Sequence, residues 1–121
     1  MMFIITWRNK SKTMINDKLQ GILGLCRKAG KMSLGHDATI TSIKKRKSQL
    51  VITCCDASDR LKKEMQDECS YDNRNIKYID VSFSMKELSL CINARAGVIS
   101  IDDQGFANKL ESIITGGYEN D

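Results

Sequence analysis

The strongest constraint on the fold is a short, uninterrupted apolar run, LVITCC, at residues 50–55. A run of this length without alternating polar positions is typical of a central strand that is buried on both faces. Amphipathic patterns stand on either side of it, and further short apolar runs follow at residues 76–81 and 97–101. This alternation predicts an α/β domain whose helices cover both faces of a small sheet.

Five segments carry the apolar spacing or the capping signals of helices. The first has its apolar stripe from Leu19 to Ala29 and ends at Gly30, and the second runs from about residue 35 to Arg46. Each of the remaining three segments begins at an N-cap signal: Ser58, the capping-box pair Ser84 and Glu87, and Asp102 or Asp103. The buried face of the last helix is expected to comprise Phe106, Leu110, Ile113 and Ile114.

Charge is distributed unevenly along the chain. The net charge is only +4, but four cations are consecutive at residues 44–47, whereas the acidic residues are scattered. A charge run of this kind is commonly just a solvated face. It also favours a polyanionic partner, because clustered cations raise the local concentration of phosphates.

Cysteine and histidine usage argues against a metal site or a cofactor. The five cysteines are odd in number and form no C-x-x-C pair, and the single histidine, His36, is remote from any such pair. Zinc spacing is therefore absent, and we expect reduced thiols that pack as small apolar groups in a cytoplasmic protein. No segment approaches the roughly 20 apolar residues that span a bilayer.

The 121 residues are enough for one domain with one core. We expect residues 1–13 to be a poorly ordered N-terminal extension, because Met14 begins a more usual start and the apolar residues 1–6 precede their cations, unlike a signal peptide. The domain is then expected over residues 14–117, with a tail at 118–121, as a monomer.

An enzymatic function is not favoured by the motifs. Asp56 follows the buried strand, where open α/β sheets often hold catalytic groups. However, the chain contains neither a P-loop sequence nor a dinucleotide-binding glycine pattern, and no nucleophile elbow stands near His36. We therefore expect no catalytic residues.

Two blocks in order carry a resemblance to a known family. The first combines LGLCRKAGK at residues 23–31, Gly35, a helix, the basic turn at residues 44–47, LVI at residues 50–52 and Asp56. The second is DQGFANKL at residues 103–110. Together they resemble the kink-turn-binding ribosomal proteins of the L7Ae/L30e type, in particular their short bacterial, YlxQ-like branch, over about residues 19–114.

The resemblance implies a three-layer α/β/α sandwich with a four-stranded mixed sheet. It also implies an RNA-binding protein, with ribosomal or other structured RNA, and the ribosome itself, as partners. In the family, the helix start after the glycine enters the widened groove of a kink-turn, and the loop before the last strand packs against a flipped-out nucleotide. An acidic residue at the position of Asp56 serves there as a helix cap.

The resemblance and the basic clusters together define the expected RNA-binding residues. The cations at residues 27–31 are expected within reach of Gly35, and Lys44 and Arg46 are expected to flank the helix start. The full set is Arg27, Lys28, Lys31, Gly35, His36, Asp37, Thr41, Lys44, Arg46, Ala94, Arg95 and Ala96.

One departure from the family pattern keeps a second interpretation open. The family carries an Asn-Glu pair followed three residues later by a Lys, and here the matching positions are Asp37, Ala38 and Thr41. Asp37 cannot donate through its side chain, Ala38 offers no base contact, and Thr41 removes a cation. The alternative is a protein–protein interaction module that keeps the fold without kink-turn recognition.

Overall fold

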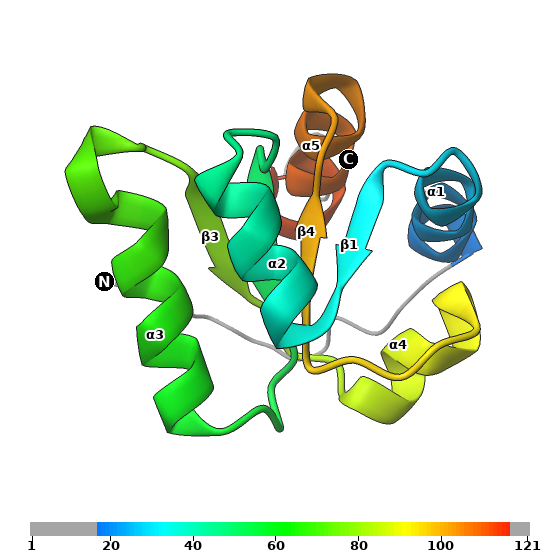
Figure 1. Ribbon diagram of the computed structural model, residues 1–121. Helices are drawn as coiled ribbons and strands as arrows, with labels where there is room; N and C mark the ends of the chain where they lie inside the picture. The colour runs from blue at the N-terminus through cyan, green and yellow to red at the C-terminus, as the bar shows by residue number, and fades with distance from the viewer. Residues whose placement is uncertain (1–16, 117–121) are drawn as a thin grey trace.

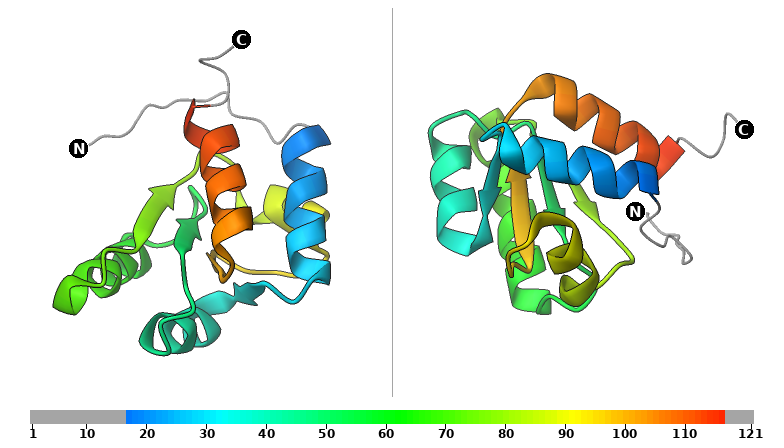
Figure 2. Two further views of the ribbon diagram at one scale, coloured as in Figure 1. Left: turned by 90° about the horizontal axis from the view of Figure 1, so that it is seen from above. Right: turned by 90° about the vertical axis from the view of Figure 1, so that its right-hand side faces the viewer.

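The computed structural model describes residues 17–116 and shows a four-stranded sheet between two helical layers (Figures 1 and 2). Helices α2 and α3 cover one face, and α1, α4 and α5 cover the other. The expected three-layer sandwich is confirmed, while the expectations for residues 1–16 and 117–121 lie outside the described part. The elements are α1 (Asp17–Lys28), β1 (Met32–Leu34), α2 (Gly35–Lys44), β2 (Leu50–Thr53), α3 (Asp59–Ser70), the 3-10 turn η3 (Tyr71–Asn73), β3 (Lys77–Asp80), α4 (Met85–Ile92), β4 (Val98–Ile101), α5 (Gln104–Glu111) and the π-helical turn η4 (Ser112–Gly116).

The strand order β1-β4-β2-β3 gives the sheet two distinct ends. Strand β4 is antiparallel to both β1 and β2, and β2 is parallel to β3. Ile101 at the end of β4 pairs with Met32 and Leu50, the first residues of their strands. We call the end of the sheet that holds these three residues the upper end, as drawn in Figure 1. The opposite end, where β1 and β2 finish and β4 begins, is the lower end.

Alternation of side chains along the central strands builds a core on each face. Ile52 and Ile99 belong to the larger cluster, under α1, α4 and α5, and Val51 and Val98 belong to the cluster under α2 and α3. All four side chains are essentially inaccessible to solvent. The apolar run at the centre of β2 is thus buried on both sides, as its sequence predicts.

Two element boundaries and one core residue differ from expectation. Helix α2 ends at Lys44 instead of Arg46, because Arg46 takes a left-handed conformation with φ of 62°. Strand β2 ends at Thr53, since the amide of Cys54 turns to the carbonyl of Gly97. Phe106 is only partly buried, because α5 turns Ala107 and Leu110 toward the core.

All five cysteines are free thiols, but they occupy different environments. Cys26, Cys54 and Cys69 are buried, and desolvation raises the pKa of each to about 12, so that they stay protonated. Cys91 is partly buried and Cys55 is exposed. Among residues 17–116, no His, Cys, Asp and Glu side chains gather as a metal-binding group of three or more. Over the same residues, none of the helices combines the length and apolar character that crossing a bilayer requires.

Candidate functional site

Three segments meet at the lower end of the sheet: the start of α2, the loop after β2, and the loop before β4 (Figure 1). Leu34 pairs with Ile99, so Gly35 follows β1 at the edge where β4 begins. The loop after β2 is tied to the same edge, because the amide of Cys54 donates to the carbonyl of Gly97 at 3.0 Å. The structure therefore brings the two segments singled out by the sequence to one end of the molecule.

The start of α2 exposes backbone donors. Gly35 has a φ of +88°, which L side chains rarely adopt, and this conformation lets strand β1 turn directly into a helix. Leu34 occupies the N-cap position in an extended conformation and cannot cap through its apolar side chain. The N–H groups of the first turn are therefore left for another acceptor, and their partial positive charge suits a phosphate.

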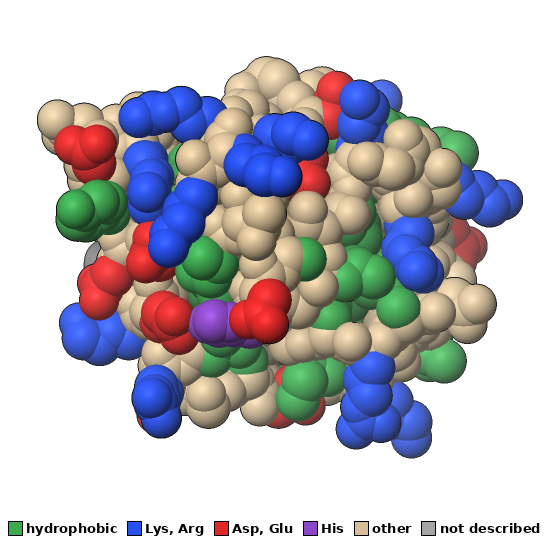
Figure 3. All heavy atoms as spheres, in the orientation of Figure 1, with side chains coloured by type: hydrophobic (Ala, Val, Ile, Leu, Met, Phe, Trp, Pro, Cys, Tyr) green, Lys and Arg blue, Asp and Glu red, His purple; other side chains and the backbone are tan. Residues whose placement is uncertain are grey.

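Acidic side chains surround this helix start. The Nδ1 atom of His36 lies 2.8 Å from an oxygen of Asp37, and its Nε2 atom lies 2.9 Å from an oxygen of Glu64 on α3. The hydrogen bond to Asp37, followed by that to Glu64, raises the pKa of His36. Figure 3 shows the histidine between two acidic side chains. Both carboxylates oppose the approach of a phosphate, and nothing in the sequence indicated that Glu64 of α3 lies beside His36.

The loop before β4 is tightly packed on its inner side. Asn93 ends α4 in a left-handed conformation with φ of 55°, and Ala96 is buried. A Cβ atom on Gly97 would lie 3.1 Å from the Met85 sulfur, so a larger residue here would require the Met85 side chain to shift. Ala94 is partly buried and Arg95 is exposed, so this short stretch presents small side chains and one cation.

Asp56 has the capping role that the resemblance implied. Its Oδ1 atom accepts a hydrogen bond from the amide of Met85 at 3.0 Å, at the start of α4. Ser84 and Glu87 complete the predicted capping box at the same helix start. The carboxylate thus satisfies one of the free donors of α4.

Three cations of the sequence-predicted site, Lys31, Lys44 and Arg46, lie at the opposite end of the sheet. Lys31 stands at the upper end, because its carbonyl accepts a hydrogen bond from the amide of Asp102 just after β4. Lys44 and Arg46 close α2 at that same end, about 15 Å along the helix from Gly35. Figure 3 shows blue side chains gathered above and apart from the histidine.

The remaining predicted residues divide between α1 and α2. Arg27 donates from its guanidinium to the carbonyl of Ile92, which ties α1 to the last turn of α4. Lys28 is exposed in the last turn of α1, and Thr41 is exposed in the second half of α2. The predicted set therefore splits into a lower group, an upper group and an anchor at Arg27.

Comparison with known proteins gives consistent relatives. Residues 17–111 match the model of the ribosomal protein L7Ae/L30e/S12e/Gadd45 family. The RNA-binding protein YlxQ of Bacillus subtilis (strain 168) is 36% identical over 93 residues, which are 77% of this chain and 91% of that protein. The RNA-binding protein YlxQ of Enterococcus faecium is 33% identical over 99 residues, covering 82% and 93%.

Solved structures share the architecture. A protein of unknown function from Bacillus halodurans matches with a TM-score of 0.75 and 27% identity, over 82% of this chain and 98% of that one. The 15.5 kD RNA-binding protein of Giardia lamblia matches with a TM-score of 0.61 and 17% identity, over 90% and 94%. The second likeness concerns the fold alone.

Proposed function

Because this chain belongs to the ribosomal protein L7Ae/L30e/S12e/Gadd45 family, we propose that it is a non-enzymatic, cytoplasmic RNA-binding protein. The observation that carries the proposal is the family match over residues 17–111, together with the two relatives that are named RNA-binding proteins. The proposed partner is a structured RNA, including ribosomal RNA, and the chain acts on it as a monomer.

The lower end is the surface that we assign to this RNA. Uncapped N–H groups at the start of α2 offer donors to phosphate oxygens, and such contacts position a nucleic acid without reading its sequence. Ala94 offers a small, partly exposed side chain against which a base can pack, and Arg95 adds a cation for a phosphate. Lys31, Lys44 and Arg46 are left out, because they lie at the opposite end.

Kink-turn reading at this surface is proposed to be weak. Asp37 places a fully exposed carboxylate where the family has an amide, and Ala38 and Thr41 supply neither of the other two contacts. The bridge from His36 to Glu64 adds a second carboxylate to the same surface. Binding is expected to depend on backbone contacts and RNA shape more than on base edges.

A protein–protein interaction module is the second candidate, and one observation favours it. Leu25 of α1 is 60% exposed and Leu90 of α4 is 73% exposed, on two helices that pack against each other. Large apolar side chains that are exposed on neighbouring helices contribute to a protein partner's contact surface where they form a continuous patch. A partner held there would show a much flatter salt response than an RNA held by phosphates.

The test is a titration of a labelled kink-turn RNA, and of a duplex lacking its G·A pairs, over a series of salt concentrations. Replacement of Arg95 with glutamate should weaken binding of the kink-turn by about tenfold, because it removes one phosphate contact and adds a repulsive charge. The same reversal at Lys18, exposed at the start of α1, is the matched control and should change affinity less than about twofold. A folded protein that binds neither RNA at about 50 mM salt would favour the interaction module.

A further inference from the structure

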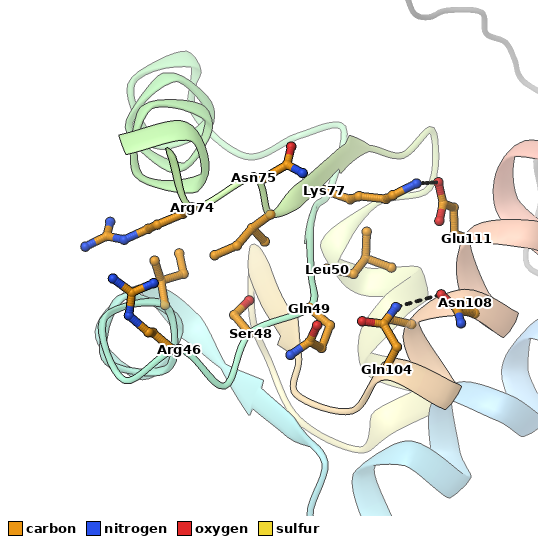
Figure 4. Close-up of a pocket in the computed structure, with 13 residues that line it drawn as sticks. Arg46, Ser48, Gln49, Leu50, Arg74, Asn75, Lys77, Gln104, Asn108 and Glu111 are labelled. Carbon is orange, nitrogen blue, oxygen red and sulfur yellow. Dashed lines mark hydrogen bonds and ion pairs between the residues drawn. The ribbon is translucent and has the colours of Figure 1, made fainter. Parts of the chain in front are cut away.

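A pocket of about 220 Å³ opens at the upper end, between the end of α2, the starts of β2 and β3, and α5. Polar side chains from four different segments face it (Figure 4). Those that the argument uses are Arg46, Gln49, Arg74, Asn75, Lys77 and Gln104. The proposed RNA surface at the lower end makes no use of this site.

One unpaired cation, Arg46, lines the pocket, and it belongs to the run of cations at residues 44–47. Arg74 is paired with Glu68 at 2.8 Å and Lys77 with Glu111 at 3.0 Å, so their charges are largely neutralised. Within residues 17–116, in contrast, none of the four cations at residues 44–47 lies within 4.0 Å of a carboxylate. All four are exposed. A run of four uncompensated cations beside a polar pocket is therefore free to bind phosphates.

The basic turn is held in one conformation before any ligand arrives. The amides of Lys47 and Ser48 both donate to the carbonyl of Ser42, at 3.0 and 3.3 Å. Arg46 adopts a φ of 62°, a left-handed conformation that is costly for a residue other than glycine. The Arg46 amide donates to the Ile43 carbonyl at 3.1 Å, so this bond and that of the Lys47 amide form a Schellman motif that fixes the direction in which the basic turn leaves α2.

A buried polar cluster fixes the same turn to the sheet. The hydroxyl groups of Ser33 and Ser42 each donate to the Asp102 carboxylate at 2.6 Å. Ser100 Oγ lies 2.6 Å from the same carboxylate and 2.7 Å from Ser48 Oγ. Ser42, Ser48 and Ser100 are buried. We name these five residues the Asp102 cluster.

The rim of the pocket offers groups that suit a nucleobase. The Arg74 guanidinium lies 5.1 Å from the centroid of the Tyr71 ring, and Tyr71 is 65% exposed. Aromatic rings and guanidinium planes are the surfaces on which unpaired bases stack. The side-chain amides of Gln49, Asn75 and Gln104 line the same pocket. Gln49 and Gln104 each donate one hydrogen bond within the protein, to the Lys47 carbonyl and to Asn108, and their carbonyl oxygens remain acceptors for base edges.

From these observations we infer that the upper end is a second RNA-binding site, which takes a single-stranded segment. The basic turn holds consecutive phosphates, and the pocket receives one unstacked nucleotide. A row of cations next to a small polar pocket, with the Tyr71 ring beyond its edge against Arg74, matches a strand of linked nucleotides better than one free anion. The choice of RNA as the polyanion rests on the proposed function, whereas the location of the site does not.

The experiment compares two charge-matched variants of the full chain. One carries Lys44→Gln, Lys45→Gln and Lys47→Gln, and the other carries Lys18→Gln, Lys63→Gln and Lys109→Gln at exposed positions outside the pocket. Each is titrated with an unstructured RNA of about 12 nucleotides and with the kink-turn RNA without single-stranded extensions. Adenosine monophosphate and inorganic phosphate are added separately, while the backbone amides of residues 44–50 and 74–77 are followed by nuclear magnetic resonance.

The first variant should lose about tenfold in affinity for the single strand, and its salt slope should fall by about 2 units. The affinity of the control variant for the single strand should change by less than about threefold, and the two variants should bind the kink-turn with similar affinities. Equal losses in both variants, or small anions that shift the same amides as strongly as the strand, would overturn the second site. Kink-turn binding that persists in that event leaves the proposed function standing, whereas loss of binding to every RNA refutes the proposed function itself.

Discussion

The two ends of helix α2 carry opposite charges. At its start, His36 is held between Asp37 and Glu64, while at its close four cations follow one another. Both arrangements stabilise the helix, because acidic groups favour the positive end of the helix dipole and basic groups the negative end. For phosphate binding they act oppositely: the carboxylates weaken the natural anion site at the start, and the cations create one at the close. Helix stability and RNA affinity are therefore in conflict at one end only.

The largest effect is expected from Asp102, which anchors the upper end. Asp102→Ala leaves buried serine hydroxyl groups without their acceptor, so the free energy of unfolding should fall by about 2–4 kcal/mol. Chemical denaturation measures this loss. Asp102→Asn keeps the shape of the side chain and one acceptor oxygen, so its free energy of unfolding should lie between those of Asp102→Ala and the unaltered protein. A loss below about 1 kcal/mol for Asp102→Ala would show that the basic turn does not depend on the Asp102 cluster.

Next in size is the recovery of base recognition at the lower end. The combined change Asp37→Asn, Ala38→Glu and Thr41→Lys restores the family pattern and should raise affinity for a standard kink-turn by at least about tenfold, since each good base contact discriminates by about 1–3 kcal/mol. In titrations at one salt concentration, the gain in affinity for the kink-turn should exceed the gain for a duplex without G·A pairs. Strong, selective binding by the unaltered protein would contradict the loss of recognition, and His36, Arg95 or backbone groups would then have to supply it.

A smaller effect on RNA affinity at the lower end is expected when the pH is changed. Because the pKa of His36 is raised, its protonated form is present at lower pH, offsets Asp37 and Glu64, and is lost as pH rises through that pKa. Kink-turn affinity should therefore fall by about threefold between about pH 6 and about pH 8. The stabilising contribution to folding is lost in the same direction, but solvent screening limits it to a few tenths of a kcal/mol. The control is His36→Asn, whose affinity should be flat over this range.

The smallest expected change concerns Arg46. Arg46→Gly relieves the left-handed conformation, so the free energy of unfolding should rise by about 0.5 kcal/mol, after the greater flexibility of glycine in the unfolded chain is allowed for. Affinity for a single-stranded RNA should fall at the same time by about threefold, because one cation is lost. Thermal denaturation and titration of the same sample separate the two effects. A less stable variant would mean that Arg46 is held by contacts that outweigh its conformational cost.

Sequence patterns predicted most of the fold. Apolar runs and caps located three of the four strands and all five helices, because burial on two faces and helix capping are local properties of the chain. The remaining strand, β1, was implied only by the resemblance to the family. The error at Thr53 arose because the Cys54 amide bonds to Gly97, in a distant part of the chain. The error at Lys44 has a local cause, since the amides of Arg46 and Lys47 bond back to Ile43 and Ser42 and end the helix early. Phe106 was placed too deep, since spacing alone does not determine which side of α5 faces the sheet.

The site was harder to predict, for a geometric reason. Lys31 and Gly35 are four residues apart, yet the intervening strand β1 takes them to opposite ends of the sheet. His36 and Glu64 are 28 positions apart and lie 2.9 Å from each other. Residues that are close in sequence lie close in space within a helix, whereas residues on either side of a strand lie at opposite ends of the sheet. The pairing of Arg74 with Glu68 and the polar pocket beside it likewise depend on how separate elements pack.

The central position of β4 has a consequence for the order of events during synthesis. This strand comes from residues 98–101, and within residues 17–116 it is the only partner of β1 as well as the antiparallel partner of β2. A chain leaving the ribosome from its N-terminus can therefore assemble β2, α3 and β3 as a local unit, while β1 waits for more than sixty residues of further synthesis before its partner exists. Fragments that stop before Val98 should remain without a complete sheet, and the whole molecule should reach its native state late and in one step.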